Sequence, residues 1–128
     1  YWYDYVTITG PNSITLQGSG TYDQGYTLSW SINPYNAANV TWILNTGNPF
    51  SITGYVYDSQ GIERGWAGQS VSLTCQLSNG GTAMPTQVSE SLSPTSQQTT
   101  LTQQVSGSTG STTVTVYISY TCPTNRGG

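Results

Sequence analysis

The chain has 128 residues and a mass of 13.7 kDa, a length that fits one domain with a single core. Only 5% of its residues are charged, lysine and histidine are absent, and five acids against two arginines give a net charge of −3. Without the imidazole of histidine, Ser-His-Asp and Cys-His catalysis are excluded, and without the amine of lysine, Schiff-base catalysis is excluded. Two cysteines alone cannot form the usual Cys/His zinc site. A pI near 4.1 argues against binding to nucleic acid.

Apolar and polar residues alternate with a period of two along most of the chain, which predicts β-strands. Glycine, proline and asparagine clusters separate these runs, and no helical period or internal repeat interrupts them. The pattern predicts an all-β fold, an antiparallel sandwich of seven to nine strands in a single domain over 1–128. The expected strands cover residues 1–9, 13–17, 26–32, 40–44, 50–57, 69–77, 99–105 and 112–122.

The last expected strand, 112–122, alternates most clearly, with Cys122 on its apolar face. Cys75 occupies an equivalent position on the strand 69–77. One disulfide between these two cysteines is therefore predicted, and it implies an extracellular or cell-surface location. No apolar run is long enough to span a membrane.

Three further expectations concern the remaining segments. Gly54 inside a strand indicates a bulge or a close contact, and residues 58–68 are expected to form a loop. Residues 82–104 form a Ser/Thr/Gln tract that contains a strand only near its end. The last strand is expected to lie beside the first.

The runs VTITGPNS, YTLSWSINP and AANVTW, over residues 6–44, resemble the front half of bacterial Ig-like domains of the invasin and intimin type. The resemblance implies an Ig-like sandwich and a role as a spacer or adhesive module of a surface protein. Trp42 precedes both cysteines, so the bridge joins a different pair of strands from that of antibody-type domains.

The N-terminal strand is rich in aromatic residues, and an exposed apolar patch of this kind usually marks a contact surface. Two interpretations remain open for it. The strand either packs on its own domain or pairs with a neighbouring subunit by β-augmentation. The predicted subunit contacts are Tyr1, Trp2, Tyr3, Tyr5, Val6 and Ile8.

Asn39-Val40-Thr41 is an N-glycosylation sequon, either a modified site or a chance match. Trp66, expected in a loop, is a candidate sugar platform, since flat aromatic rings pair with the apolar faces of sugars. Asp58 and Glu63 could bind calcium or act as a glycosidase pair, but a solvated loop in which Glu63 neighbours Arg64 explains them better.

The favoured hypothesis is a non-enzymatic extracellular structural protein. It would be the repeating subunit of a surface filament, with residues 1–9 as the joining strand and identical subunits as partners. The alternative is a carbohydrate-binding or adhesive Ig-like module of a larger secreted protein. A small secreted enzyme with two carboxylates is the least favoured. No cofactor, metal, nucleic acid or membrane span is predicted, while glycans are a candidate partner.

Overall fold

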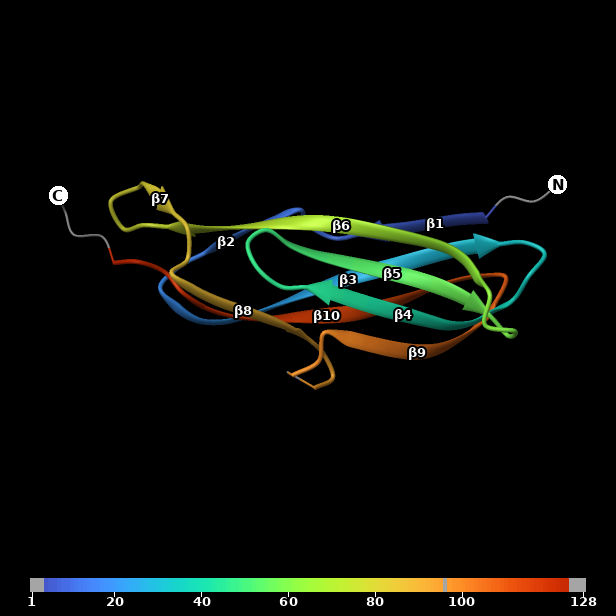
Figure 1. Cartoon of the computed structure of the whole chain (residues 1–128). Helices are drawn as coiled ribbons and strands as arrows, with labels where there is room; N and C mark the ends of the chain where they lie inside the picture. Colours follow the sequence, from blue (N-terminus) through green and yellow to red (C-terminus); the bar gives the residue numbers. More distant parts are fainter. Residues whose placement is uncertain (1–3, 96, 125–128) are drawn as a thin grey trace.

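Two β-sheets packed face to face make up the chain, and Figure 1 shows the two layers running along one long axis. The computed structural model describes residues 4–95 and 97–124. The expected all-β sandwich with one disulfide is confirmed. The strands are β1 (Asp4–Thr9), β2 (Ser13–Leu16), β3 (Ser19–Ile32), β4 (Ala37–Asn45), β5 (Phe50–Asp58), β6 (Glu63–Gln76), β7 (Thr82–Ala83), β8 (Gln87–Leu92), β9 (Thr100–Gly107) and β10 (Thr109–Thr121).

The first sheet has the order β1-β3-β10-β8, and all its pairings are antiparallel. Its centre is the long pairing of β3 with β10, which runs from Thr121 opposite Ser19 to Thr109 opposite Ser31. β1 and β8 each pair with only one strand of this sheet, so they form its two edges.

The second sheet has the order β2-β6-β5-β4-β9, and the short strand β7 also pairs with β6. β2 runs parallel to β6, whereas the other pairings are antiparallel. The chain therefore changes sheet between β1 and β2, over the residues Gly10, Pro11 and Asn12. Within the described residues, no helix is long and apolar enough to cross a membrane.

The core consists of the residues that the period of two places on inward faces. β3 contributes alternate positions from Tyr26 to Ile32, and β4 contributes Val40, Trp42 and Leu44, all of them buried as expected. β3, β4, β5 and β10 contain no lysine or arginine. Their β-branched and aromatic residues can therefore form this core without burying a cation.

A disulfide between Cys75 and Cys122 joins the two sheets, as predicted. Cys75 lies on β6 and Cys122 directly follows β10, and both are buried. The bridge closes a loop with a sequence separation of 47 residues. In the chain-entropy model, a loop of that size stabilises the fold by about 4 kcal/mol.

Three sequence-based expectations about strand positions were wrong. The expected loop 58–68 ends much earlier, because β6 already begins at Glu63. The polar tract also contains the strand β8, where Glu90 occupies an inward position that a polarity pattern does not predict. β10 lies between β3 and β8, so the last strand does not lie beside the first.

Two glycines allow the sheets to approach closely. At Gly54, as expected for a close contact, an added Cβ would lie 2.8 Å from Leu28 Cδ2 on the opposite sheet. At Gly65, an added Cβ would lie 2.6 Å from Val6 Cγ2 on β1. Gly65 is therefore the place on β6 against which β1 packs.

Replacing Gly65 tests this packing. We expect Gly65→Ala to destabilise the fold by about 1–3 kcal/mol, because the new methyl group overlaps Val6. Adding Val6→Ala should recover part of the loss, since it removes the overlapping atom. Gly25→Ala is the matched control, because the nearest atom to its added Cβ is 3.8 Å away. Urea denaturation measures the effect, and equal stabilities of the two glycine variants would contradict it.

Candidate functional site

The N-terminal strand β1 is an edge strand bound on one side only. Its residues pair with β3 from Asp4 opposite Ile32 to Thr9 opposite Thr27. Val6 and Ile8 face the core but are only partly buried, and Tyr5 on the other face is 62% exposed. The predicted contact residues Tyr1, Trp2 and Tyr3 lie outside the described residues.

We call the surface that β1 occupies the β1 seat, which consists of the β3 edge at residues 27–32 and Gly65 on β6. This corrects the expected pairing of the first strand with residues 112–122. β3 is long enough to pair with β1 and β10 at once, so it lies between them. The expectation failed because residues 27–31 of β3 pair with β1 on one edge and with β10 on the other.

Two side-chain hydrogen bonds hold the turn after β1. The Tyr26 hydroxyl donates to the Pro11 carbonyl at 2.7 Å, and Gln69 Nε2 donates to the Gly10 carbonyl at 2.6 Å. Burial, together with the nearby Tyr22, raises the pKa of Tyr26 to about 12, so its hydroxyl remains a donor at neutral pH. These bonds hold the chain at Gly10 and Pro11, directly after β1.

Trp66 is exposed and forms an aromatic pair with the partly buried Tyr55 on the outward face of the second sheet. Sequence analysis placed Trp66 in a loop, but it lies on β6, directly opposite Tyr55 on β5. The two ring centroids are 6.2 Å apart with an interplanar angle of 32°, and Trp66 is 59% exposed. The pairing of β5 with β6 therefore fixes the position of these two rings, and a loop conformation does not.

Asn39, the sequon residue, lies on the same sheet face. It follows a β-bulge in β4 and pairs with Tyr57 on one side and Gln104 on the other. Thr41, the third sequon residue, shares a hydrogen bond of 3.2 Å with the Thr102 hydroxyl. No described residue makes a hydrogen bond with the Asn39 side chain, which is partly exposed.

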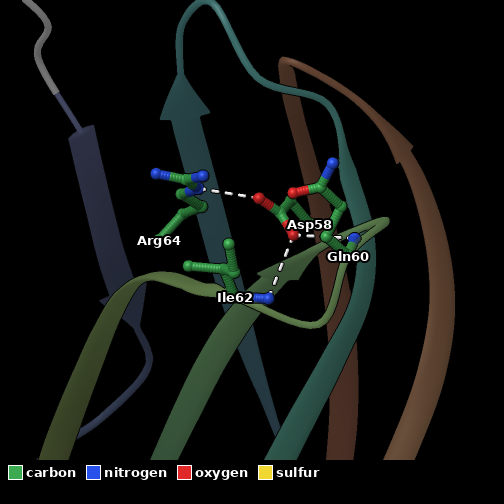
Figure 2. A network of polar contacts seen from close by, with 4 residues as sticks. All are labelled: Asp58, Gln60, Ile62 and Arg64. Carbon is green, nitrogen blue, oxygen red and sulfur yellow. Dashed lines mark hydrogen bonds and ion pairs between the residues drawn. The ribbon is translucent and has the colours of Figure 1, made fainter.

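Asp58 and Arg64 lie at the connection between β5 and β6, and Figure 2 shows their polar contacts. Asp58 Oδ1 accepts from the backbone N–H groups of Gln60 and Ile62, and Oδ2 accepts from Arg64 Nε at 2.8 Å. The Arg64 guanidinium carbon lies 3.5 Å from the centre of the Tyr35 ring. The partner of Arg64 is thus Asp58, not its sequence neighbour Glu63.

These bonds determine the chemistry of the Asp58 carboxylate. The Ile62 N–H first, and then Arg64 and Gln60, hold the pKa of Asp58 below its ordinary value, against the opposing effect of burial. Both oxygens are already engaged by donors within this turn, so the arrangement stabilises the β5–β6 connection. Among the described residues, no group of three metal-ligating side chains is close enough to hold a metal ion.

Glu90 is a buried carboxylate that sequence reasoning missed. It faces the interior from β8, where only 5% of its surface is exposed. Oε1 accepts from the Gly47 N–H at 2.9 Å, whereas Oε2 is buried and has no partner among the described residues. Burial raises the pKa of Glu90, and the Gly47 hydrogen bond opposes this only in part.

A search of protein-family models, of curated proteins and of solved structures found no match to this chain. The resemblance to invasin-type domains stays a prediction. The functional evidence therefore comes from the edge strand β1, the aromatic sheet face and the position of the sequon.

Glu90 predicts a pH dependence of stability. A pKa raised on folding means that the folded state binds the proton more tightly, so stability should rise as the pH falls from above the folded-state pKa towards the ordinary value of 4.5. Glu90→Gln should stabilise the protein at pH 8 by about 1 kcal/mol, because an uncharged amide replaces the unpaired oxygen. It should also flatten this pH dependence.

Urea denaturation between pH 4 and pH 8 measures both effects. Glu63→Gln is the control, since it removes one carboxylate from an exposed position without changing the interior. A Glu90→Gln protein that is less stable than the parent at pH 8 would contradict this account of Glu90.

Proposed function

We propose that the chain is a non-enzymatic extracellular structural protein, the repeating subunit of a surface filament joined through its N-terminal strand. The observation that carries the proposal is β1. It is an edge strand with a partly buried apolar face, and it occupies a seat that the identical strand of another subunit would fit equally well.

Strand exchange is the mechanism by which β1 would join subunits. The turn at Gly10 and Pro11 is held by Tyr26 and Gln69, so β1 can leave the seat without disturbing the rest of the fold. The β1 of the next subunit then makes the same pairing with β3 and the same contact with Gly65. Since the contacts are identical, exchange is a low-cost route to association, and a head-to-tail contact that does not close produces a filament.

The surface chemistry supports an assembling extracellular protein. The disulfide favours an oxidising location, and a chain with five acids and two arginines repels identical copies only weakly. In the proposed filament, Tyr1, Trp2, Tyr3 and Tyr5 contact the receiving subunit together with Val6 and Ile8.

Glycosylation of Asn39 is part of this proposal. The Asn39 amide nitrogen would displace the phosphate leaving group of an activated sugar donor at its anomeric carbon and lose one proton. The sequon and the outward position of Asn39 on β4 support this modification.

Paired cysteines distinguish exchanged from unexchanged β1. Thr7 lies opposite Ser29 on the outward face of the first sheet, so Thr7→Cys with Ser29→Cys reports which chain supplies β1 to each β3. Oxidation of subunits assembled at high concentration should give a ladder of covalent multimers on a non-reducing gel. Oxidation of dilute monomers should lock β1 within its own chain and prevent assembly until a reductant is added.

The pair Thr27→Cys and Thr113→Cys is the matched control. These residues lie opposite each other on β3 and β10, with their hydroxyls 2.9 Å apart, and both strands remain in one chain during exchange. Their bridge should form only within a single chain and leave assembly unchanged. The proposal fails if concentrated protein stays monomeric by size exclusion and negative-stain microscopy, with every bridge between the cysteines introduced on β1 and β3 inside one chain.

A carbohydrate-binding or adhesive module is the second candidate. The exposed Trp66 and its neighbour Tyr55 favour it, because aromatic rings on an outward sheet face can receive the apolar face of a sugar. Under this proposal, retention of the protein on immobilised glycans should depend on Trp66.

A further inference from the structure

The outward face of the second sheet places the sequon and the exposed aromatic residues in two adjacent rows. In one row, Asn39 lies between Tyr57 and Gln104. In the next row, Tyr55 lies between Trp66 and Thr41. Because side chains of positions two apart on a strand share a face, Tyr55 and Tyr57 are neighbours on β5. The tyrosines therefore connect Asn39 to Trp66 across the sheet.

The distance between the two ends suits a short oligosaccharide. Trp66 lies two strands and two residues away from Asn39, which corresponds to about 12 Å at the usual strand spacing and rise. The surface between them contains tyrosine rings and threonine hydroxyls, with Glu63 the charged residue at its margin, opposite Tyr57.

Trp66 is costly to leave in water. It is 59% exposed, although its ring lies beside that of Tyr55. Exposed aromatic surface of this kind marks a site of contact in folded proteins. A glycan on Asn39 could cover Trp66, because the Asn39 amide has no partner among the described residues and faces the same side of the sheet.

We infer that this face, made of Tyr57, Tyr55 and Trp66, is the binding surface for an N-glycan carried by Asn39 of the same chain. The inference rests on the glycosylation included in the proposed function. The apolar faces of the sugar rings stack on the aromatic rings, and Thr41 and Gln104 lie beside the attachment point to bond the sugar hydroxyls. The bound glycan shields Trp66 from solvent and from neighbouring molecules.

The test compares protein secreted from a host that glycosylates Asn-X-Thr sequons with two variants that lose the sequon. Asn39→Gln removes the acceptor, and Thr41→Val removes the sequon while Asn39 stays in place. Intact mass gives the occupancy of the site. Hydroxyl-radical footprinting then gives the oxidation rate of Trp66, with Tyr22 as the internal reference because it is 41% exposed on the other sheet.

Trp66 should be oxidised several-fold more slowly in the glycosylated protein than in both variants, while the rate at Tyr22 stays constant. The loss of thermal stability caused by Asn39→Gln should also disappear in a Trp66→Ala background, since the glycan then has no ring to cover. If Trp66 were oxidised at the same rate in a fully glycosylated protein and in the two variants, the inference would be overturned, while glycosylation of Asn39 would be unaffected.

Two other outcomes identify different failures. A wild-type mass equal to that of the bare chain would remove both glycosylation and this inference, while the cysteine test of β1 exchange would be unaffected. Protection of Trp66 in the Asn39→Gln protein by free glycan, without protection in the glycosylated wild type, would overturn the inference in favour of a platform for external sugars.

Discussion

The long antiparallel pairing of β3 with β10 is the constraint on which the other features depend. It extends over the whole of β10, from Thr109 to Thr121, and leaves one edge of each strand for a further partner. β1 occupies the end of β3 at residues 27–32, and β8 occupies the opposite end of β10, from Val116 to Thr121. Neither strand can become central in this sheet. The strand that begins the chain is therefore an edge strand, and an unpaired edge is where association between chains occurs.

The disulfide makes this arrangement compatible with exchange of β1. Cys122 follows β10 and Cys75 lies on β6, so the bridge joins the centre of one sheet to the other sheet, far along the sequence from β1. The turn at Gly10 that follows β1 accepts a hydrogen bond from Gln69 Nε2. The apolar residues of β1, Val6 and Ile8, are only partly buried, whereas the fully buried core residues lie on other strands. In the proposed filament, the partner of β3 in this pairing would be the β1 of another chain.

Sequence periodicity predicted the strands whose inward faces are continuous and apolar. The positions of Tyr26, Trp42, Val116 and both cysteines follow from alternation alone. Alternation did not predict the start of β6, because Gly65 has no side chain and Ala67 a small one where they face β1 and the core. It also missed β8, where Glu90 is buried among apolar residues. In both cases the residue on the inward face depends on the residues that pack against it. The sequence of a single strand does not contain that information.

The candidate site was predicted in its parts but not in its arrangement. Asn39 and Trp66 were recognised separately from a sequon and from an exposed aromatic residue, yet their common face depends on the register of β4, β5 and β6. The same register places Asn39 near the start of β4, beside the edge strand β9 of the second sheet, whereas the β1 seat lies at the edge of the first. Outward residues of β4 point away from the first sheet, because the inward residues Val40 and Trp42 form the core between the two. In the proposed filament, a glycan on Asn39 would therefore cover a face that strand exchange does not use, so one subunit could carry the glycan and exchange β1 at the same time.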